Sequence, residues 1–218
     1  KAPFVEIKQP NIIFITTDEV EEKTALKVTD YELSFDEVLL KDVNFEIKST
    51  DKVAIVGANG AGKTTLFQTI FNNNNSSIEI NENIKIGYLS QIQGQTLNYS
   101  NTIADEFFDI GFKTYDDIKE YLEGYNFDEE LLNQKIGTLS GGEKNLIQLA
   151  KISEVGADLL LLDEPTSHLD TYSQIALEKA IKNYKGAILM VSHDYYTIAN
   201  CMDYVLFIEN KKIRKINI

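Results

Sequence analysis

Residues 57–65, GANGAGKTT, constrain the fold of this chain more than any other stretch. They fit the pattern G-x-x-x-x-G-K-[ST] and lie between an apolar run at 51–56, which predicts a buried strand, and a run at 66–71, which predicts a helix. Glycine lets such a loop curl so that successive N–H groups face an anion, and the helix adds its unpaired N–H groups and positive dipole end. This order therefore predicts a site for the phosphates of a nucleoside triphosphate.

Lys63 and the two threonines after it make the loop more specific than an ordinary glycine turn. The Lys63 ammonium can reach the β- and γ-phosphates, and the Thr64 hydroxyl can ligate Mg²⁺. A glycine-rich turn between a strand and a helix can also have a purely structural role, but such a turn would not need the lysine and the two threonines. The predicted nucleotide-binding residues of the loop are Gly57, Ala58, Asn59, Gly60, Ala61, Gly62, Lys63, Thr64 and Thr65.

The bulk composition is ordinary for a globular protein. The 218 residues are 43% hydrophobic and 25% charged, which suits one large α/β domain or two small lobes. The single cysteine, Cys201, excludes a disulfide framework and fits a reducing, cytoplasmic location. No apolar run approaches the roughly 20 residues of a membrane-spanning helix, so we expect no direct membrane insertion.

Acidic residues dominate the charge, and the formal net charge is −13. Residues 105–130 contain ten acidic side chains, opposed only by Lys113 and Lys119. Such a surface repels nucleic-acid phosphates, so this region is a poor candidate for direct nucleic-acid contact. The simpler interpretation is a solvated face that aids solubility.

The N-terminal part predicts irregular chain followed by antiparallel strands. Residues 1–24 carry two of the three prolines and an acidic patch, and we interpret them as the tail of a linker leading into an edge strand. Between 25 and 48, apolar and polar residues alternate, which predicts antiparallel strands with one wet face. Phe35 lies at a strand end there and could stack on adenine, or it could be an ordinary core residue.

The rest of the chain alternates strands and helices. Residues 102–135 have apolar positions at helical spacing, which predicts a helical subdomain inserted at about 96–150. Ser140 precedes the next helix and is placed to cap it. The further predicted strands are 78–80, 84–89, 158–163, 187–192, 204–208 and 212–216, and the further helices are 172–183 and 195–202.

The apolar strand predicted at 158–163 ends in Asp163, and a second carboxylate, Glu164, directly follows it. The carboxyl end of a parallel strand is the usual ligand side of an α/β sheet. Asp163 can therefore ligate Mg²⁺ together with Thr64, and Glu164 can orient or deprotonate an attacking water. Two carboxylates beside a polyphosphate would repel it without the metal, so the pair itself implies Mg²⁺.

Two further polar side chains follow predicted strands. His193 directly follows the strand predicted at 187–192, and its imidazole could hydrogen-bond a γ-phosphate oxygen. Gln91 follows the strand at 84–89, and its carboxamide could contact the metal or water. A lone histidine is more often structural, but the position after a buried strand and before a helix favours function. The other histidine, His168, receives no role.

Taken in order, these motifs resemble the nucleotide-binding domain of ATP-binding-cassette proteins. The matching segments are 57–65 (Walker A), Gln91 (Q-loop), 139–143 (LSGGE, signature), 159–164 (Walker B and its glutamate), 167–170 (D-loop) and His193 (switch histidine), and Phe35 stands at the place of the family's adenine-stacking aromatic. Generic phosphate-loop kinases and GTPases lack the signature. SMC-type ATPase heads have a long coiled coil between their two Walker motifs. In this chain the two motifs are close, since Lys63 and Asp163 are only 100 residues apart.

The resemblance implies a domain over 25–218. Its fold is an α/β P-loop NTPase core with an antiparallel β subdomain and an inserted helical subdomain. It also implies a Mg²⁺-dependent ATPase that closes head to tail over two ATP molecules with a second cassette, in the same longer chain or in a homodimer. A lone copy is then expected to bind weakly and hydrolyse slowly. The implied catalytic residues are Glu164, His193 and Gln91, the metal ligands are Thr64, Gln91 and Asp163, and the residues facing the partner's nucleotide are Ser140, Gly141, Gly142, Glu143 and the D-loop Asp170.

Within the family, the motifs most resemble the ABC-F subfamily. The segments are LSGGEK at 139–144, DEPTSHLD at 163–170 and a short stretch from Lys63 to Gln91. The resemblance implies the second cassette of a soluble protein that acts on the ribosome through regions outside this chain, as a translation factor or an antibiotic-resistance protein. Ser167 replaces a usual asparagine, and Leu146 a usual basic residue.

The alternative is the ATPase subunit of an ABC membrane transporter. Such a subunit would bind a coupling helix of its permease in the groove beside Gln91.

Overall fold

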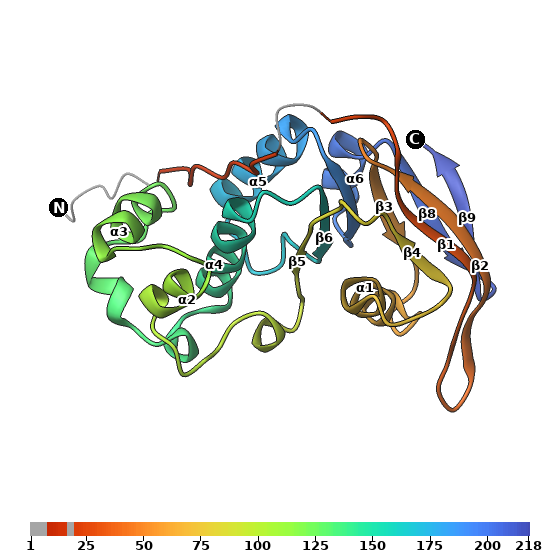
Figure 1. The fold of residues 1–218 in the computed structure, drawn as a ribbon, viewed down its shortest axis with the longest axis horizontal. Helices are drawn as coiled ribbons and strands as arrows, with labels where there is room; N and C mark the ends of the chain where they lie inside the picture. Colours follow the sequence, from red (N-terminus) through yellow and green to blue (C-terminus); the bar gives the residue numbers. More distant parts are fainter. Residues whose placement is uncertain (1–7, 17–19) are drawn as a thin grey trace.

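The computed structural model describes residues 8–16 and 20–218 (Figure 1). Strands and helices alternate along most of this part of the chain. The strands are β1 (Thr24–Ser34), β2 (Val38–Lys48), β3 (Lys52–Val56), β4 (Ile78–Ile80), β5 (Ile86–Leu89), β6 (Leu159–Asp163), β7 (Ala187–Val191), β8 (Tyr204–Glu209) and β9 (Lys212–Asn217). The α-helices are α1 (Lys63–Asn72), α2 (Ile103–Asp109), α3 (Tyr115–Glu123), α4 (Gly141–Glu154), α5 (Thr171–Asn183) and α6 (Tyr195–Cys201).

A six-stranded sheet forms the centre, with strand order β5-β6-β7-β3-β8-β9. The pairs from β5 to β8 are parallel, and only β9 runs antiparallel to its neighbour. The carboxyl ends of the parallel strands therefore meet at one edge, which is the edge where α/β proteins bind ligands. This arrangement confirms the predicted α/β class.

Strand β6 shows why its sequence is a continuous run of leucines. Leu159 and Leu161 point into a core shared with α1 and the antiparallel sheet, whereas Leu160 and Leu162 point into a core shared with α4 and α5. All four are buried, because helices or strands cover both faces of the parallel sheet. Figure 1 shows α1 on one side of this sheet and α4 with α5 on the other.

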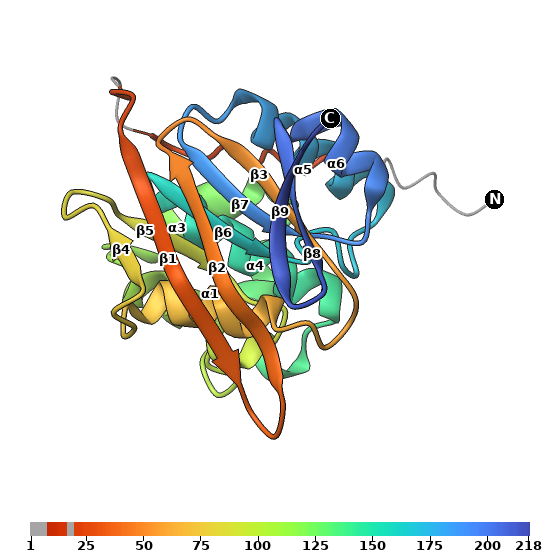
Figure 2. The same cartoon turned by 90° about the vertical axis from the view of Figure 1, so that its right-hand side faces the viewer.

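A second sheet contains three antiparallel strands in the order β2-β1-β4. Figure 2 shows its long β1–β2 hairpin crossing in front of the central sheet. The apolar runs at 25–28 and 31–35 belong mainly to one strand, β1, rather than to two. The strand continues through a register shift between Val28 and Tyr31, where Asp30 takes a positive φ of 48°. A bulge of this kind interrupts the alternation without ending the strand.

The prediction of an edge strand within residues 1–24 is wrong for the part of that segment that the structure describes. Residues 8–16 and 20–23 contain no strand, and β1, which begins at Thr24, lies in the middle of its sheet. Instead, Ile12 and Phe14 are buried in the α4–α5 core. The rings of Phe14 and Tyr184 pack edge to face, with 5.8 Å between their centroids. Residues 1–7 and 17–19 of the predicted linker lie outside the described residues.

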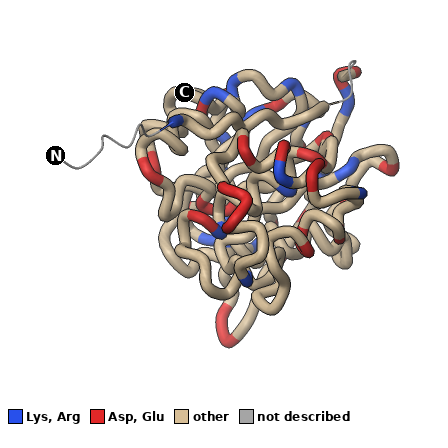
Figure 3. The backbone as a smooth tube through the Cα atoms, turned by 90° about the vertical axis from the view of Figure 1, so that its left-hand side faces the viewer, with Lys and Arg blue, Asp and Glu red and all other residues tan. Residues whose placement is uncertain are grey.

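Helices α2 and α3 and the 3₁₀ turn η2 (Glu129–Asn133) form a helical lobe between β5 and α4. Both helices begin with a capping box. The hydroxyls of Thr102 and Thr114 accept from the N–H groups of Asp105 and Asp117, and the backbone N–H groups of the two threonines donate to the carboxylates of the same aspartates. Figure 3 looks onto this side of the molecule and shows acidic stretches on it. The predicted boundaries of the subdomain, at about 96 and 150, stay predictions, and α4 itself continues to Glu154.

Candidate active site

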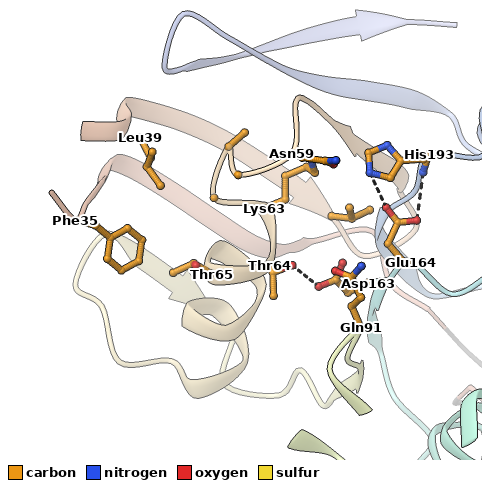
Figure 4. A pocket seen from close by; sticks show the side chains of 14 residues that line it. Phe35, Leu39, Asn59, Lys63, Thr64, Thr65, Gln91, Asp163, Glu164 and His193 are labelled. Carbon is orange, nitrogen blue, oxygen red and sulfur yellow. Dashed lines mark hydrogen bonds and ion pairs between the residues drawn. The ribbon is translucent and has the colours of Figure 1, made fainter. Parts of the chain in front are cut away.

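A cavity of about 580 Å³ opens at the carboxyl edge of the central sheet. Figure 4 shows its side chains, which come from the β1–β2 turn and the start of β2, from the loop before α1 and the first turn of α1, and from the ends of β5, β6 and β7. The lining residues are Phe35, Leu39, Asn59, Gly60, Ala61, Gly62, Lys63, Thr64, Thr65, Gln91, Asp163, Glu164, Val191 and His193. Segments far apart in the sequence are thus brought together as the motif order predicted.

The loop before α1 depends on glycine at two positions. Gly60 and Gly62 have φ angles of 77° and 96°, in the left-handed region that L side chains rarely adopt. A Cβ on Gly62 would also meet the Leu33 side chain at 2.6 Å. No side chain caps the start of α1, so its first N–H groups remain available to an anion in the cavity.

Lys63 is fixed by the carbonyl groups of its own loop. Its ammonium donates hydrogen bonds to the carbonyl oxygens of Gly57 (2.6 Å) and Ala58 (2.8 Å), and the residue is only 8% exposed. Burial lowers the pKa of this ammonium, while the carboxylates of Glu164 and Asp163 oppose the shift. Gly57 and Ala58, predicted among the nucleotide contacts, are not among the residues that line the cavity; their carbonyl oxygens accept the two hydrogen bonds from Lys63.

Thr64 and Asp163 meet across the start of α1 and the end of β6. The Thr64 hydroxyl donates to Asp163 Oδ2 at 2.7 Å. The other oxygen, Oδ1, is buried and accepts no hydrogen bond from the described part of the chain. Burial raises the pKa of the Asp163 carboxyl, which the Thr64 bond partly offsets.

These two oxygens fit a hard divalent cation. Mg²⁺ prefers oxygen ligands and is usually held by one or two protein side chains together with substrate phosphates. An orphaned buried carboxylate oxygen beside a hydroxyl supplies such ligands, and Gln91 lines the same cavity. Among the described residues there is no cluster of three or more acidic, histidine or cysteine side chains that would hold a metal alone.

Glu164 occupies a strained turn directly after β6. Its φ angle is 54°, an uncommon value for a residue with a side chain, and its N–H donates to the carbonyl of Val191 at 2.8 Å. The carboxylate faces His193, whose Nε2 lies 3.2 Å from Oε1 and whose backbone N–H donates to Oε2 at 3.3 Å. Burial raises the pKa of the Glu164 carboxyl, and the proximity of His193 counteracts that rise.

The far end of the cavity is apolar. Phe35 is 67% exposed, so it is not a core residue, and Leu39 lies beside it in Figure 4. Leu39 and Val191 were missed from the sequence. Leu39 reaches the cavity only because the hairpin pairs Ser34 with Val38, a register that the alternation of residues leaves open.

A second cavity, of about 400 Å³, shares no residue with the first. Ser140 caps α4 as predicted: its hydroxyl accepts from the Glu143 N–H, and the Glu143 carboxylate accepts from the Ser140 N–H. Asp170 likewise caps α5 by accepting from the Ser173 N–H. The lining residues are Ser140, Gly141, Gly142, Glu143, Leu146, His168, Leu169, Asp170 and Ser173.

His168 is the main residue of this second cavity that the sequence did not reveal. Its φ angle is 63°, and it lies against the first turn of α4. A Cβ on Gly141 would meet its ring at 3.1 Å, and one on Gly142 would meet its carbonyl at 2.5 Å. Both glycines are therefore needed for the close approach of the turn after β6. This approach depends on the left-handed backbone conformation of His168. A histidine does not indicate that conformation in a sequence, as a glycine would.

The fold and the first cavity define a P-loop nucleotide-binding domain of the ATP-binding-cassette class. Comparison with protein families agrees. The model of the family described as "ABC transporter" matches residues 40–167, which is more than half of the chain, and the chain belongs to this family.

Relatives among curated proteins include two F family members of Arabidopsis thaliana. The chain is 34% identical over 194 residues to "ABC transporter F family member 5" of Arabidopsis thaliana, covering 86% of this chain and 28% of that protein. It is 34% identical over 180 residues to "Protein GCN20" of Saccharomyces cerevisiae, covering 79% and 24%. It is 32% identical over 191 residues to "Energy-dependent translational throttle protein EttA" of Escherichia coli, covering 83% and 34%. The chain thus spans a quarter to a third of their length.

Solved structures share the fold. One described as the ATP binding subunit of an ABC transporter superposes with a TM-score of 0.74 at 23% identity, covering 89% of this chain and 90% of that one. A dimeric bacterial ABC transporter cassette superposes with a TM-score of 0.74 at 19% identity, covering 88% and 98%. These likenesses establish the architecture alone. No helix within residues 8–16 and 20–218 has the length and hydropathy to cross a membrane.

Proposed function

We propose that the chain is a Mg²⁺-dependent ATP-hydrolysing cassette that works with a second cassette. One observation carries the proposal: Lys63, Asp163 and Glu164 line one cavity, and Glu164 is held there by His193. A cation, a metal-binding carboxylate and a candidate base are the groups that triphosphate hydrolysis requires.

Binding would use the two ends of the cavity differently. The phosphates would lie against the N–H groups of the loop and of α1, with Lys63 exchanging its two carbonyl partners for β- and γ-phosphate oxygens. The adenine would stack on Phe35, with Leu39 beside it. Mg²⁺, held by Thr64, Asp163 and Gln91, would neutralise the phosphate charge when bound.

Hydrolysis would be assisted by Glu164. Its carboxylate would orient a water whose oxygen forms the new bond to the γ-phosphorus, while the bond from that phosphorus to the β-bridging oxygen breaks. The water's proton would pass to the carboxylate and then to solvent, leaving ADP and phosphate. The imidazole of His193 would hold Glu164 in place and hydrogen-bond a γ-phosphate oxygen, and Gln91 would contact the attacking water.

The second cavity supports the need for a partner. Its glycines and the N-terminus of α4 can bind an anion, yet it shares no residue with the first cavity. We infer that Ser140, Gly141, Gly142, Glu143 and Asp170 face the nucleotide of a second cassette, in the same longer chain or in a homodimer. Each lone copy then carries two half-sites.

The identity of the relatives favours an ABC-F role. Their names include a translational throttle protein, so we propose a cytoplasmic protein that acts on the ribosome, as a translation factor or an antibiotic-resistance protein. This chain would be its second cassette. Ribosome contacts would come from regions outside these residues, because the acidic helical lobe repels nucleic-acid phosphates.

One observation favours the transporter alternative. A cavity of about 320 Å³ lies beside the segment that follows Gln91, and most of its lining side chains are apolar. A coupling helix of a permease could bind there. Its lining includes Phe71, Ile86, Tyr88, Leu97, Ile110, Ile152 and Val155.

The deciding experiment uses Glu164→Gln in the full natural chain. Removing the base should reduce hydrolysis by about 100-fold or more while ATP still binds, which traps the closed cassette pair. We expect the trapped protein to co-sediment with ribosomes. Glu82→Gln, an exposed change of the same type, should behave as wild type. Retention on a membrane permease in place of ribosomes would overturn the ABC-F assignment.

The requirement for a second cassette is tested by dilution. Residues 1–218 alone should hydrolyse ATP slowly, and the rate per molecule should rise with protein concentration or on adding a partner cassette. Fast turnover by a strictly monomeric preparation would contradict the half-site arrangement.

A further inference from the structure

Helix α4 buries polar side chains on one face, at intervals of three residues. Asn145 is 3% exposed and Gln148 is 1% exposed. Residues three apart lie next to each other on a helix, and a buried amide is costly unless its donors and acceptors are bonded. Their partners therefore indicate what these side chains do.

Gln148 holds the backbone immediately before Gln91. Its Oε1 accepts from the Ser90 N–H at 3.1 Å, and its Nε2 donates to the Ser90 carbonyl at 3.3 Å. The hydroxyl of Thr96 donates to the same Oε1. Both backbone groups of Ser90 are thus fixed to α4, one residue away from a side chain that lines the first cavity.

Asn145 continues the connection to the second cavity. Its Oδ1 accepts from Gln148 Nε2 at 3.1 Å and from Gln93 Nε2 at 3.3 Å. Its Nδ2 donates to the carbonyl of Ser167 at 2.6 Å. Ser167 directly precedes His168, which covers the glycines at the start of α4.

Together these bonds form an unbroken bridge. It runs from the Ser90 backbone through Gln148 and Asn145 to the Ser167 backbone. A branch through Gln93, whose amide also donates to the Gly141 carbonyl at 2.9 Å, reaches the first turn of α4 directly. One end of the bridge lies next to the first cavity, and the other end lies next to the second.

We propose that Asn145 and Gln148 are positioning residues that couple the two cavities. The proposal rests on the proposed function, in which each cavity is half of an ATP site. A shift of Gln91 toward the γ-phosphate or its metal moves Ser90, and the bridge carries that shift to Ser167, His168 and the start of α4. Occupancy of one half-site then sets the geometry that the same cassette offers to the nucleotide of its partner.

The test compares Asn145→Asp and Gln148→Glu with wild type in the full chain. Each change keeps the size of the side chain but replaces an N–H donor by an oxygen acceptor, which would face the Ser167 or Ser90 carbonyl. We expect kcat to fall by about tenfold and the Hill coefficient for ATP to fall toward one. The affinity of the isolated cassette for a fluorescent ATP analogue should stay within about twofold, since neither residue lines the first cavity.

The pH profile separates positioning from simple destabilisation. When protonated, the carboxyl introduced by Asn145→Asp regains an O–H donor for the Ser167 carbonyl. The ratio of variant to wild-type kcat should therefore rise as the pH falls from about 8 to about 6. A merely structural role would instead lower the melting temperature and leave kcat per folded molecule and the Hill coefficient unchanged.

Two further variants keep the test decisive. Ser153→Ala changes another buried polar residue of α4, whose hydroxyl donates to the Leu149 carbonyl and accepts from the Tyr125 hydroxyl. Neither of these partners lines the first or the second cavity, so kcat and cooperativity should stay unchanged. Gln93→Ala removes only the partly exposed branch, so folding should survive, and it should lower the Hill coefficient in the same direction. The coupling is refuted if Gln93→Ala leaves the Hill coefficient unchanged and the folded Asn145→Asp and Gln148→Glu proteins keep wild-type kcat and cooperativity.

Failure of the proposed function gives a different result. If Glu164→Gln hydrolyses ATP as fast as wild type, the catalytic assignment fails whatever the bridge variants do. If Glu164→Gln abolishes hydrolysis and only the bridge variants behave as wild type, the coupling alone is wrong.

Discussion

At the residue scale, Asp163 offers the most direct test of the metal site. Asp163→Asn keeps an oxygen for the Thr64 bond but removes the charge from the buried Oδ1. We expect hydrolysis to fall by at least about 100-fold, because the metal supplies several kcal/mol of transition-state stabilisation. Mg²⁺ should also lose its added effect on the melting temperature in the presence of ATP.

The control for this substitution is Asp116→Asn, an exposed change on α3. It should leave both the hydrolysis rate and the effect of Mg²⁺ on melting unchanged. An Asp163→Asn protein that melts higher with Mg²⁺ and ATP than with ATP alone, as wild type does, would show that the cation is held elsewhere.

Which side chains would share the first cavity could largely be predicted from the sequence. Asp163 ends a recognisable strand and Glu164 directly follows it, and Lys63 and His193 each come shortly after another such strand. Parallel strands end at the same edge of a sheet. The position of the apolar Leu39 depends on the register of the hairpin, and the position of His168 depends on a left-handed backbone conformation. Neither can be predicted from the residue type. The roles of all these residues remain predictions until they are tested.

At the element scale, the two left-handed glycines of the phosphate loop should differ in cost. Gly60→Ala meets open space, so only its backbone strain of about 1–2 kcal/mol applies. Gly62→Ala adds an overlap with Leu33 at 2.6 Å and should lose about 1–3 kcal/mol more. Urea unfolding without nucleotide measures both values. Equal losses would mean that the packing of β1 against the start of α1 is not rigid.

The extended segment before β1 provides a second test at this scale. Ile12 is 5% exposed and Ile13 is 59% exposed, so the same change should cost much more stability at Ile12 than at Ile13. Ile12→Ala should reduce the free energy of unfolding by about 2–4 kcal/mol, and Ile13→Ala should change it by less than about 0.5 kcal/mol. Similar small losses at both positions would show that this segment is not part of the cooperative fold.

Most elements could be predicted because their signals are local. A capping residue, Ser140, marks the start of α4, and continuous apolar runs mark β6 and β7. The burial of Ile12 and Phe14, within residues 8–16, could not be predicted in this way. Their burial depends on contacts with distant residues such as Tyr184, which no local pattern encodes.

At the scale of the whole molecule, the net charge predicts whether this chain binds nucleic acid. With a net charge of −13 and an acidic helical lobe, residues 1–218 should not bind labelled RNA at about 150 mM salt in fluorescence anisotropy. Replacing Asp116, Asp117, Glu120 and Glu123 of α3 by lysine should create weak, salt-sensitive binding. Salt-sensitive binding by the wild-type chain would instead mean that a basic surface acts despite the net charge.

The leucines of β6 have a consequence for how mutations far from the cavity act. Side chains of this strand belong to both hydrophobic cores. The strand ends at Asp163, and Glu164 directly follows it. Close-packed interiors transmit small volume changes to their neighbours. We therefore expect a repacking on either side of the sheet to displace the same two carboxylates and to alter the distance between Asp163 and Thr64.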